Sequence, residues 1–252
     1  MIIDGDGAGR ALPELALTVY ASNGISCNPS FLSKSATPRY NICFEVDKAD
    51  AVQRLLGPVL GNNIFNNFGG FATWLMDKEL LEQAKPVSGT VSLAYQYGRV
   101  LRGVTPVGAS DDLAMLGTPV FTGTLLDIAE HSEGGFDYGV ATFEDVDKNH
   151  FYIYNQNENI ISWNDRLSAP PITAPDLICY LAEEFQTPTG SPEPMRVFSN
   201  TRQDWCAFQG KKVSVLGRPC DPALREGLLG LGFAQLRREL GYAGYYQPFG
   251  KE

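Results

Sequence analysis

The sequence has no long apolar run and few of the residues that build redox or metal sites. No apolar stretch approaches the ~18 residues of a transmembrane helix, and the N-terminus lacks the basic region and apolar core of a signal peptide. There are two histidines, and the five cysteines are never spaced C-x-x-C. These absences argue against a membrane protein, a disulfide framework and a structural zinc site, and they predict a cytoplasmic protein.

Positive charge is also scarce. Lysine and arginine number 20 against 29 aspartates and glutamates, which gives a net charge of −9. Nucleic-acid binding needs a basic surface, so this balance predicts a small-molecule partner and no nucleic acid. Hydrophobic residues make up 44% of the 252 residues, which is enough to bury a core in one large domain or two smaller ones.

The pattern of predicted elements changes near residue 115. Before it, the sequence predicts helices over 12–22, 48–57, 78–84 and 88–102, and strands over 41–46 and 69–76. After it, seven short strands at regular spacing end near residue 218, followed by two short helices over 223–230 and 234–240. The spacing favours an antiparallel sandwich or a barrel-like domain. We therefore expect an α/β part over residues 1–110 and a β-rich, sandwich-like domain over 111–252.

The opening stretch MIIDGDGAGR is the most informative motif. An apolar run, a Gly-rich turn and a helix-like segment can bring backbone N–H groups and fixed side chains to a ligand. The motif contains Asp4, Gly5, Asp6, Gly7 and Arg10. A calcium loop is excluded, because Ala8 and Leu15 occupy ligand positions. A dinucleotide fingerprint lacks its acidic partner about 20 residues later. The alternative is a turn whose aspartates cap the following helix.

A second polar run, residues 155–159, follows a strongly apolar strand. It contains Asn157 and Glu158, which suit recognition of N–H and C=O groups, although asparagine also favours a hairpin turn. His131 lies at a strand end, where either a ligand-binding or a purely structural role fits. His150 is expected in a solvated turn. Neither histidine has a second metal ligand nearby, so no cofactor is evident and a metal remains unknown.

Five stretches, in order along the chain, together resemble the S-methyl thiohydantoin desulfurase-like family. They cover residues 4–14, 134–139, 155–159, 174–179 and 241–246. The resemblance implies an α/β N-terminal domain followed by a β-rich one. It also implies hydrolysis at an amidine-like carbon of a five-membered ring, with loss of a thiol. Family members carry further chain before the D-G-D-G stretch, so the α/β part here is expected to be incomplete.

That chemistry needs a base to activate water and an acid to protonate the departing group. Nearby carboxylates of different pKa can divide these roles, so the predicted catalytic residues are Asp4, Asp6 and Glu14, and Arg10 can hold a substrate carboxylate. The predicted substrate-binding residues are Gly5, Gly7, Arg10, Asn157, Glu158 and His131. We predict a hydrolase for a hydantoin or S-methyl-thiohydantoin ring, acting as a homo-oligomer or with a complementary subunit. The alternatives are a non-catalytic binding or assembly subunit and one subunit of a split hydrolase.

Overall fold

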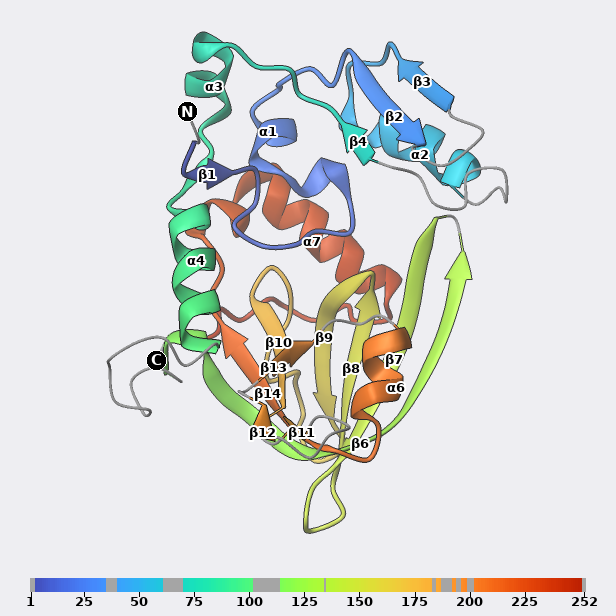
Figure 1. Ribbon diagram of the computed structural model, residues 1–252, viewed down its shortest axis with the longest axis vertical. Helices are drawn as coiled ribbons and strands as arrows, with labels where there is room; N and C mark the ends of the chain where they lie inside the picture. Colours follow the sequence, from blue (N-terminus) through green and yellow to red (C-terminus); the bar gives the residue numbers. More distant parts are fainter. Residues whose placement is uncertain are drawn as a thin grey trace.

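A curled antiparallel sheet forms the centre of the computed structural model, and helices cover parts of both its faces (Figure 1). The structure describes residues 3–34, 40–60, 70–101, 114–133, 135–182, 185–186, 192–193, 196–198 and 202–250. No helix within these ranges combines the length and the apolar character that crossing a bilayer requires.

The sheet has seven strands, and every neighbouring pair is antiparallel. In spatial order they are β13 (Arg196–Phe198), β10 (Leu177–Ala182), β14 (Lys212–Arg218), β6 (Thr118–Glu133), β7 (Phe136–Glu144), β8 (His150–Gln156) and β9 (Glu158–Asn164). The β-rich second half is therefore confirmed. The sandwich-like arrangement needs correction, because these strands form one curled sheet, nearer to the barrel-like alternative. Strand spacing is similar in both architectures, so it could not separate them.

The two faces of the sheet bury different clusters, and alternate residues of one strand separate them. On one face, Phe151 and Ile153 of β8 pack with Trp205 and Phe208 of helix α6 (Arg202–Phe208). On the opposite face, Tyr154 packs in a cluster that contains helix α7 (Gly227–Glu239) and the short 3-10 helix η1 (Leu15–Leu17). Helix α4 (Thr90–Leu101) covers this opposite face at β10 and β14.

The N-terminal part carries short strands and helices around a third cluster. Its helices are α1 (Val19–Ser22), α2 (Ala49–Leu60) and α3 (Lys78–Ala84). Its strands are β2 (Ser30–Lys34), β3 (Tyr40–Phe44), β4 (Gly70–Ala72), β1 (Gly5–Asp6) and β5 (Val87–Ser88). The first three form a small antiparallel sheet that packs with α2, and β1 pairs with β5. The division at residue 110 stays a prediction, and residues 102–113 lie outside the described ranges.

Four predicted helices differ from the structure. The segment 12–22 forms η1 and α1 instead of one helix. Helix α2 begins at Ala49 and continues through Pro58 to Leu60, and the carboxylate of Asp47 before it accepts a hydrogen bond from the hydroxyl of Ser26 at 2.8 Å. The two tail helices form the single helix α7, which follows the short 3-10 helix η3 (Pro222–Leu224).

The remaining differences concern segments without clear sequence signals. The sequence did not predict α6, and it did not predict the two-residue strands β11 (Phe185–Gln186) and β12 (Pro192–Glu193). Most of the amide-rich loop 62–70, considered as a pocket wall, lies outside the described residues.

Candidate functional site

Both aspartates of the Gly-rich turn hold local structure. The carboxylate of Asp4 accepts hydrogen bonds from the N–H of Ser92 at 2.9 Å and from its hydroxyl at 2.5 Å. These bonds lower the pKa of Asp4 and tie it to the first turn of α4. Asp6 accepts the N–H groups of Ala8 and Gly9, which closes its own turn. The capping alternative therefore describes Asp4, although the capped helix is α4 and not the next helix along the chain.

Gly5 and Gly7 serve close packing. A Cβ on Gly5 would lie 2.8 Å from the carbonyl oxygen of Val87, and one on Gly7 would lie 2.9 Å from the ring of Tyr20. Both glycines thus face protein atoms, and neither lines any cleft described below.

Arg10 is committed to backbone carbonyls. Its Nη1 donates to Pro175 at 2.7 Å and to Asp176 at 2.9 Å, and its Nη2 donates to Asn159 at 3.2 Å. Its Nε donates to Ala11 at 3.0 Å. Four of the five guanidinium N–H groups are used in this way. Arg10 therefore joins distant segments of the chain, and its binding of a substrate carboxylate stays a prediction.

Asp176 forms the second tie and is fully buried. Its Oδ1 accepts the N–H of Cys220 at 2.8 Å and a guanidinium N–H of Arg225 at 3.1 Å. Its Oδ2 accepts the hydroxyl of Tyr246 and the N–H of Phe249, both at 2.8 Å. Four of the five stretches that carry the family resemblance, those beginning at residues 4, 155, 174 and 241, meet at Arg10 and Asp176.

A separate cleft opens where the β6–β7 hairpin passes the end of α7. We call it the hairpin cleft, and its volume is about 440 Å³. The lining residues that matter below are His131, Glu133, Tyr138, Tyr154, Asn155 and Glu239. His131 stacks on Tyr138 with ring centroids 5.3 Å apart. The cleft thus brings His131, a predicted site residue, together with aromatic and acidic residues that sequence reasoning missed.

Glu14 does not line this cleft, but it contacts Gln156, and its charge acts on Tyr138 of the cleft. Its Oε1 accepts a hydrogen bond from the amide of Gln156 at 3.2 Å. Burial raises the pKa of Glu14, and the charge of Glu239 raises it further, whereas the hydrogen bond from Gln156 opposes the rise. Burial also raises the pKa of Tyr138, with added contributions from Glu239, Glu133 and Glu14. The negative charges of three carboxylates from different segments therefore all raise the pKa of Tyr138 at the cleft.

Two neighbouring amides at this site leave hydrogen-bonding atoms unused. Asn155 and Gln156 are almost completely buried, and within the described part of the chain neither Asn155 Nδ2 nor Gln156 Oε1 has a hydrogen-bond partner. An unsatisfied buried polar atom costs about 1–3 kcal/mol, so such atoms are rare without a reason. The two residues are consecutive in β8, so their side chains face opposite sides of the sheet, and Gln156 shares the face of Glu14 and Tyr138.

Asn157 and Glu158, the predicted site residues of the polar run, lie outside the lining of the hairpin cleft. Asn157 adopts a φ of 53° in the β8–β9 turn, and its Oδ1 accepts the N–H of Asp137 at 2.7 Å. Glu158 has a pKa raised by burial and lowered by the charge of Arg10. Neither residue lines the hairpin cleft, so the hairpin-turn alternative describes Asn157.

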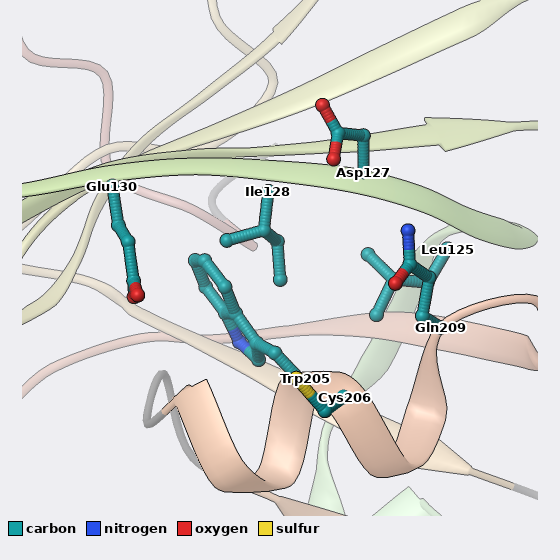
Figure 2. A pocket seen from close by; sticks show the side chains of 7 residues that line it. All are labelled: Leu125, Asp127, Ile128, Glu130, Trp205, Cys206 and Gln209. Atoms are coloured by element: carbon teal, nitrogen blue, oxygen red, sulfur yellow. The ribbon is translucent and has the colours of Figure 1, made fainter.

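A smaller cleft of about 290 Å³ lies between β6 and α6. Figure 2 shows Ile128 and Glu130 extending from β6 toward the indole of Trp205, while the carboxylate of Asp127 points away from it. Cys206 and Gln209 complete the α6 side. None of the predicted site residues lines this smaller cleft. No group of three or more metal-binding side chains occurs among the described residues.

The comparisons with known proteins point to one family. The profile described as "S-Me-THD-like, C-terminal domain" matches residues 49–235. A crystal structure of a protein from Chromobacterium violaceum superimposes with a TM-score of 0.76 at 31% sequence identity. That match covers 97% of this chain, and the chain spans 65% of the length of the Chromobacterium protein. No functionally curated protein matches the chain.

Proposed function

Because the chain belongs to the S-Me-THD-like family, we propose that it hydrolyses a hydantoin-like or S-methyl-thiohydantoin-like ring in the hairpin cleft. The observation that carries this proposal is Glu14, a carboxyl group of raised pKa that accepts a hydrogen bond from Gln156 and whose charge acts on Tyr138 of the hairpin cleft. Carboxyl groups with a raised pKa at a cleft are typical of acid–base sites.

The proposed reaction adds water and releases a thiol. The water oxygen bonds to the ring carbon that carries sulfur, and the carbon–sulfur bond breaks. A base takes one proton from the water and an acid gives one to the departing sulfur, while the other water proton ends on the ring nitrogen, so the products are the ring amide and methanethiol. No net proton is gained or lost.

Glu14 suits the acid role, because its raised pKa keeps the carboxyl protonated at higher pH than an ordinary glutamate. Glu239 is the proposed base, because it lines the cleft and its charge reaches Glu14. Gln156 Nε2 donates to Glu14, and its unpaired Oε1 would accept from a ring N–H. These groups would orient the reacting carbon between the two carboxyls.

The test is Glu14→Gln, with methanethiol release from an S-methyl thiohydantoin as the measurement. Removal of a general acid typically costs on the order of 10²–10⁴ in rate. Asp4→Asn and Asp6→Asn are the matched controls from the same segment, and we expect them to keep the wild-type rate per folded molecule. A Glu14→Gln protein that keeps the full rate would overturn the assignment.

The pH profile gives an independent measurement. Because the acid form of Glu14 is lost as pH rises, wild-type activity should fall on the alkaline side of its raised pKa. This limb should be absent from the residual activity of Glu14→Gln. A wild-type alkaline limb that persists unchanged in the variant would assign it to another group.

A split hydrolase is the second candidate, and the chain spans 65% of the length of the Chromobacterium protein. In that case the chain alone is inert, and activity appears when the polypeptide equivalent to the unmatched part of that relative is added. Inactivity under both conditions would favour a binding or assembly subunit. A cytoplasmic setting belongs to the same proposal and is supported by five unpaired cysteines.

A further inference from the structure

We propose that the open edge of strand β6 binds an extended basic segment of a partner protein as an added strand. We call this edge, formed by the main chain of residues 126–132 on the side away from β7, the β6 edge. The inference concerns a partner protein and does not involve Glu14, so it goes beyond the proposed function and stands apart from it.

The first support is that the strand beside β6 ends before β6 does. β14 pairs with β6 as far as Thr124, whereas β6 continues to the hairpin with β7 as its only paired strand (Figure 1). Just beyond β14, the N–H of Gly210 donates to the carbonyl oxygen of Leu125 at 2.8 Å. The side-chain amide of Gln209 then donates to the carbonyl oxygen of Leu126, also at 2.8 Å. The chain thus satisfies this side of β6 up to Leu126.

The second support is the direction of the main-chain groups that follow. In an antiparallel pair, opposite residues either exchange both N–H···O bonds or direct both groups away from each other. Asp137, opposite Ser132, accepts the N–H of Asn157 and donates to Asn157 Oδ1, both at 2.7 Å, so its groups face β8.

Ser132 therefore directs its own N–H and C=O away from β7. Ile128 precedes it by two full alternations of the same ladder and has the same direction. Within the part of the chain that the structure describes, neither residue has a backbone partner on that side. Main-chain groups arranged in this way are the ones to which a further strand adds.

The third support is the cleft of about 290 Å³ between this edge and α6. Leu125 lines it, and Ile128 extends toward the indole of Trp205 (Figure 2). Because side chains alternate between the two faces of a strand, every second side chain of an added strand would lie beside Ile128 and Trp205. An aliphatic side chain there would bury apolar area. The cleft therefore favours aliphatic residues at alternate positions of the segment.

Charge selects the positions between them. β6 and β7 contain neither lysine nor arginine, and their acidic residues are Asp127, Glu130, Glu133, Asp137 and Glu144. The carboxylate of Asp127 is exposed and points away from Trp205, toward the face where the other side chains of an added strand would lie. Like charges on neighbouring strands are destabilising and opposite charges are stabilising. A second copy of this chain paired through the same edge would bring acids together, whereas a segment with lysine or arginine would neutralise them.

The experiment uses a seven-residue probe, Val-Lys-Val-Lys-Val-Lys-Val, acetylated and amidated at its ends. Binding to the purified chain is measured by isothermal titration calorimetry. We expect this peptide to bind at least tenfold tighter than the same peptide with glutamate in place of each lysine. The preference should shrink as salt is raised from 20 to 500 mM, because the charges are exposed. A lysine peptide methylated at every backbone nitrogen has no N–H to donate and should bind at least tenfold more weakly.

Hydrogen exchange measured by NMR locates the bound peptide. The amides of Ile128 and Ser132 should exchange more slowly in its presence, because their N–H groups face the β6 edge. The amides of Ala129 and His131 serve as internal controls, since they face β7 and should change little.

The variant Asp127→Lys tests the origin of the charge preference. We expect the preference for the lysine peptide over the glutamate peptide to fall at least threefold, with the melting temperature unchanged because Asp127 is exposed. The matched control is Asp147→Lys, which changes an exposed aspartate in the β7–β8 turn and should keep the wild-type preference.

The outcomes separate the parts of the inference. Equal affinity for the lysine and glutamate peptides, or a preference unchanged in Asp127→Lys, would overturn the basic character of the partner. Undiminished binding of the N-methylated peptide would overturn strand addition. Absence of binding by every peptide, or protection that leaves Ile128 and Ser132 unaffected, would overturn the inference as a whole, and none of these results bears on hydrolysis by Glu14.

Discussion

Asp176 shows how much one side chain can hold together. It is fully buried, and it satisfies two N–H groups, a guanidinium and a phenol from two separate segments, 220–225 and 246–249. Removing one partner from a buried ionic network typically costs about 3–5 kcal/mol, because the remaining charge stays unpaired. We therefore expect Asp176→Ala to lower the free energy of unfolding by about this amount.

The measurement is urea denaturation followed by tryptophan fluorescence. Asp165→Ala is the matched control, since Asp165 is exposed and accepts a hydrogen bond from Tyr152 at 3.3 Å. It should change stability by less than about 0.5 kcal/mol. Equal effects of the two substitutions would contradict the structural role of Asp176.

Asp4 gives a pH-dependent prediction. Its pKa lies below the ordinary value of 3.8, first because the Ser92 hydroxyl binds the ionised carboxylate and then because the Ser92 N–H does. A carboxyl with a lowered folded pKa stabilises the fold above its unfolded pKa. That contribution disappears as pH falls through the lower, folded pKa. Wild type should therefore melt above Asp4→Ala at neutral pH, and the two melting temperatures should converge in acid.

Differential scanning fluorimetry of the two proteins between about pH 7 and pH 3 checks this, a window that brackets the ordinary titration range of aspartate. Asp221→Ala is a useful comparison, because Asp221 caps η3 through the Ala223 N–H and lies away from α4. A gap between wild type and Asp4→Ala that does not change with pH would remove the electrostatic explanation.

At the scale of elements, the β6–β7 hairpin reaches helix α2 through a contact of two glycines (Figure 1). Gly135 has a φ of +88°, and a Cβ on it would lie 3.2 Å from the Cα of Gly57. Alanine at this φ costs about 1–2 kcal/mol, and the contact with Gly57 adds to it. We expect Gly135→Ala to destabilise the protein by about 2 kcal/mol.

The variant Gly210→Ala separates the cost of a positive φ from the cost of the contact with Gly57. Gly210 has a similar φ of +77°, and a Cβ there meets nothing within 4 Å. Thermal unfolding of both variants should show the larger loss for Gly135→Ala, and hydrogen exchange should increase at the tip of the hairpin. Equal losses would mean that the contact with Gly57 contributes nothing.

Local signals explain which elements could be predicted. Helix α3 has the predicted bounds, because Asp77 caps it through the Leu80 N–H and helix-forming residues follow. The two tail helices were separated at glycines that in fact serve packing. A Cβ on Gly232 would lie 2.7 Å from Leu17, so this glycine allows α7 to approach η1. Tertiary contact therefore outweighs the low helix propensity of glycine.

The candidate site was less predictable, because its residues come from distant segments. Glu14 was identified within the N-terminal motif, and His131 at a strand end. Gln156 lies in the polar run, but the sequence singles out only Asn157 and Glu158 there as site residues. Glu239 carries no local signal, because only the packing of α7 against the sheet brings it to the hairpin cleft. The antiparallel register then places Tyr138 opposite both His131 and Gln156.

At the scale of the whole molecule, the surface predicts association. Leu228 and Leu231 of α7 are 71% and 70% exposed, one helical turn apart on the same side. Exposed leucines so close together favour contact with another protein surface. We expect the purified chain to form a homo-oligomer, and Leu228→Glu/Leu231→Glu to shift it toward monomer.

Sedimentation velocity at micromolar concentration measures this shift. Val146→Glu is the matched control, because Val146 is 96% exposed in the β7–β8 turn and stands apart from α7 in the sequence. It should leave the association unchanged. A wild-type chain that sediments as a stable monomer without a copurifying partner would contradict the prediction.

The hydrogen bonds of Asp176 also impose an order on the synthesis of the protein. The ribosome makes Asp176 first, and its partners Tyr246 and Phe249 follow 70 and 73 residues later. Until they emerge, burying the carboxylate would leave half of its hydrogen bonds unmade, so water competes successfully for it. A nascent chain that stops before Tyr246 should therefore keep this side of the sheet open to proteases. Residues 246–249 can therefore close this side of the sheet only well after Asp176 has been made.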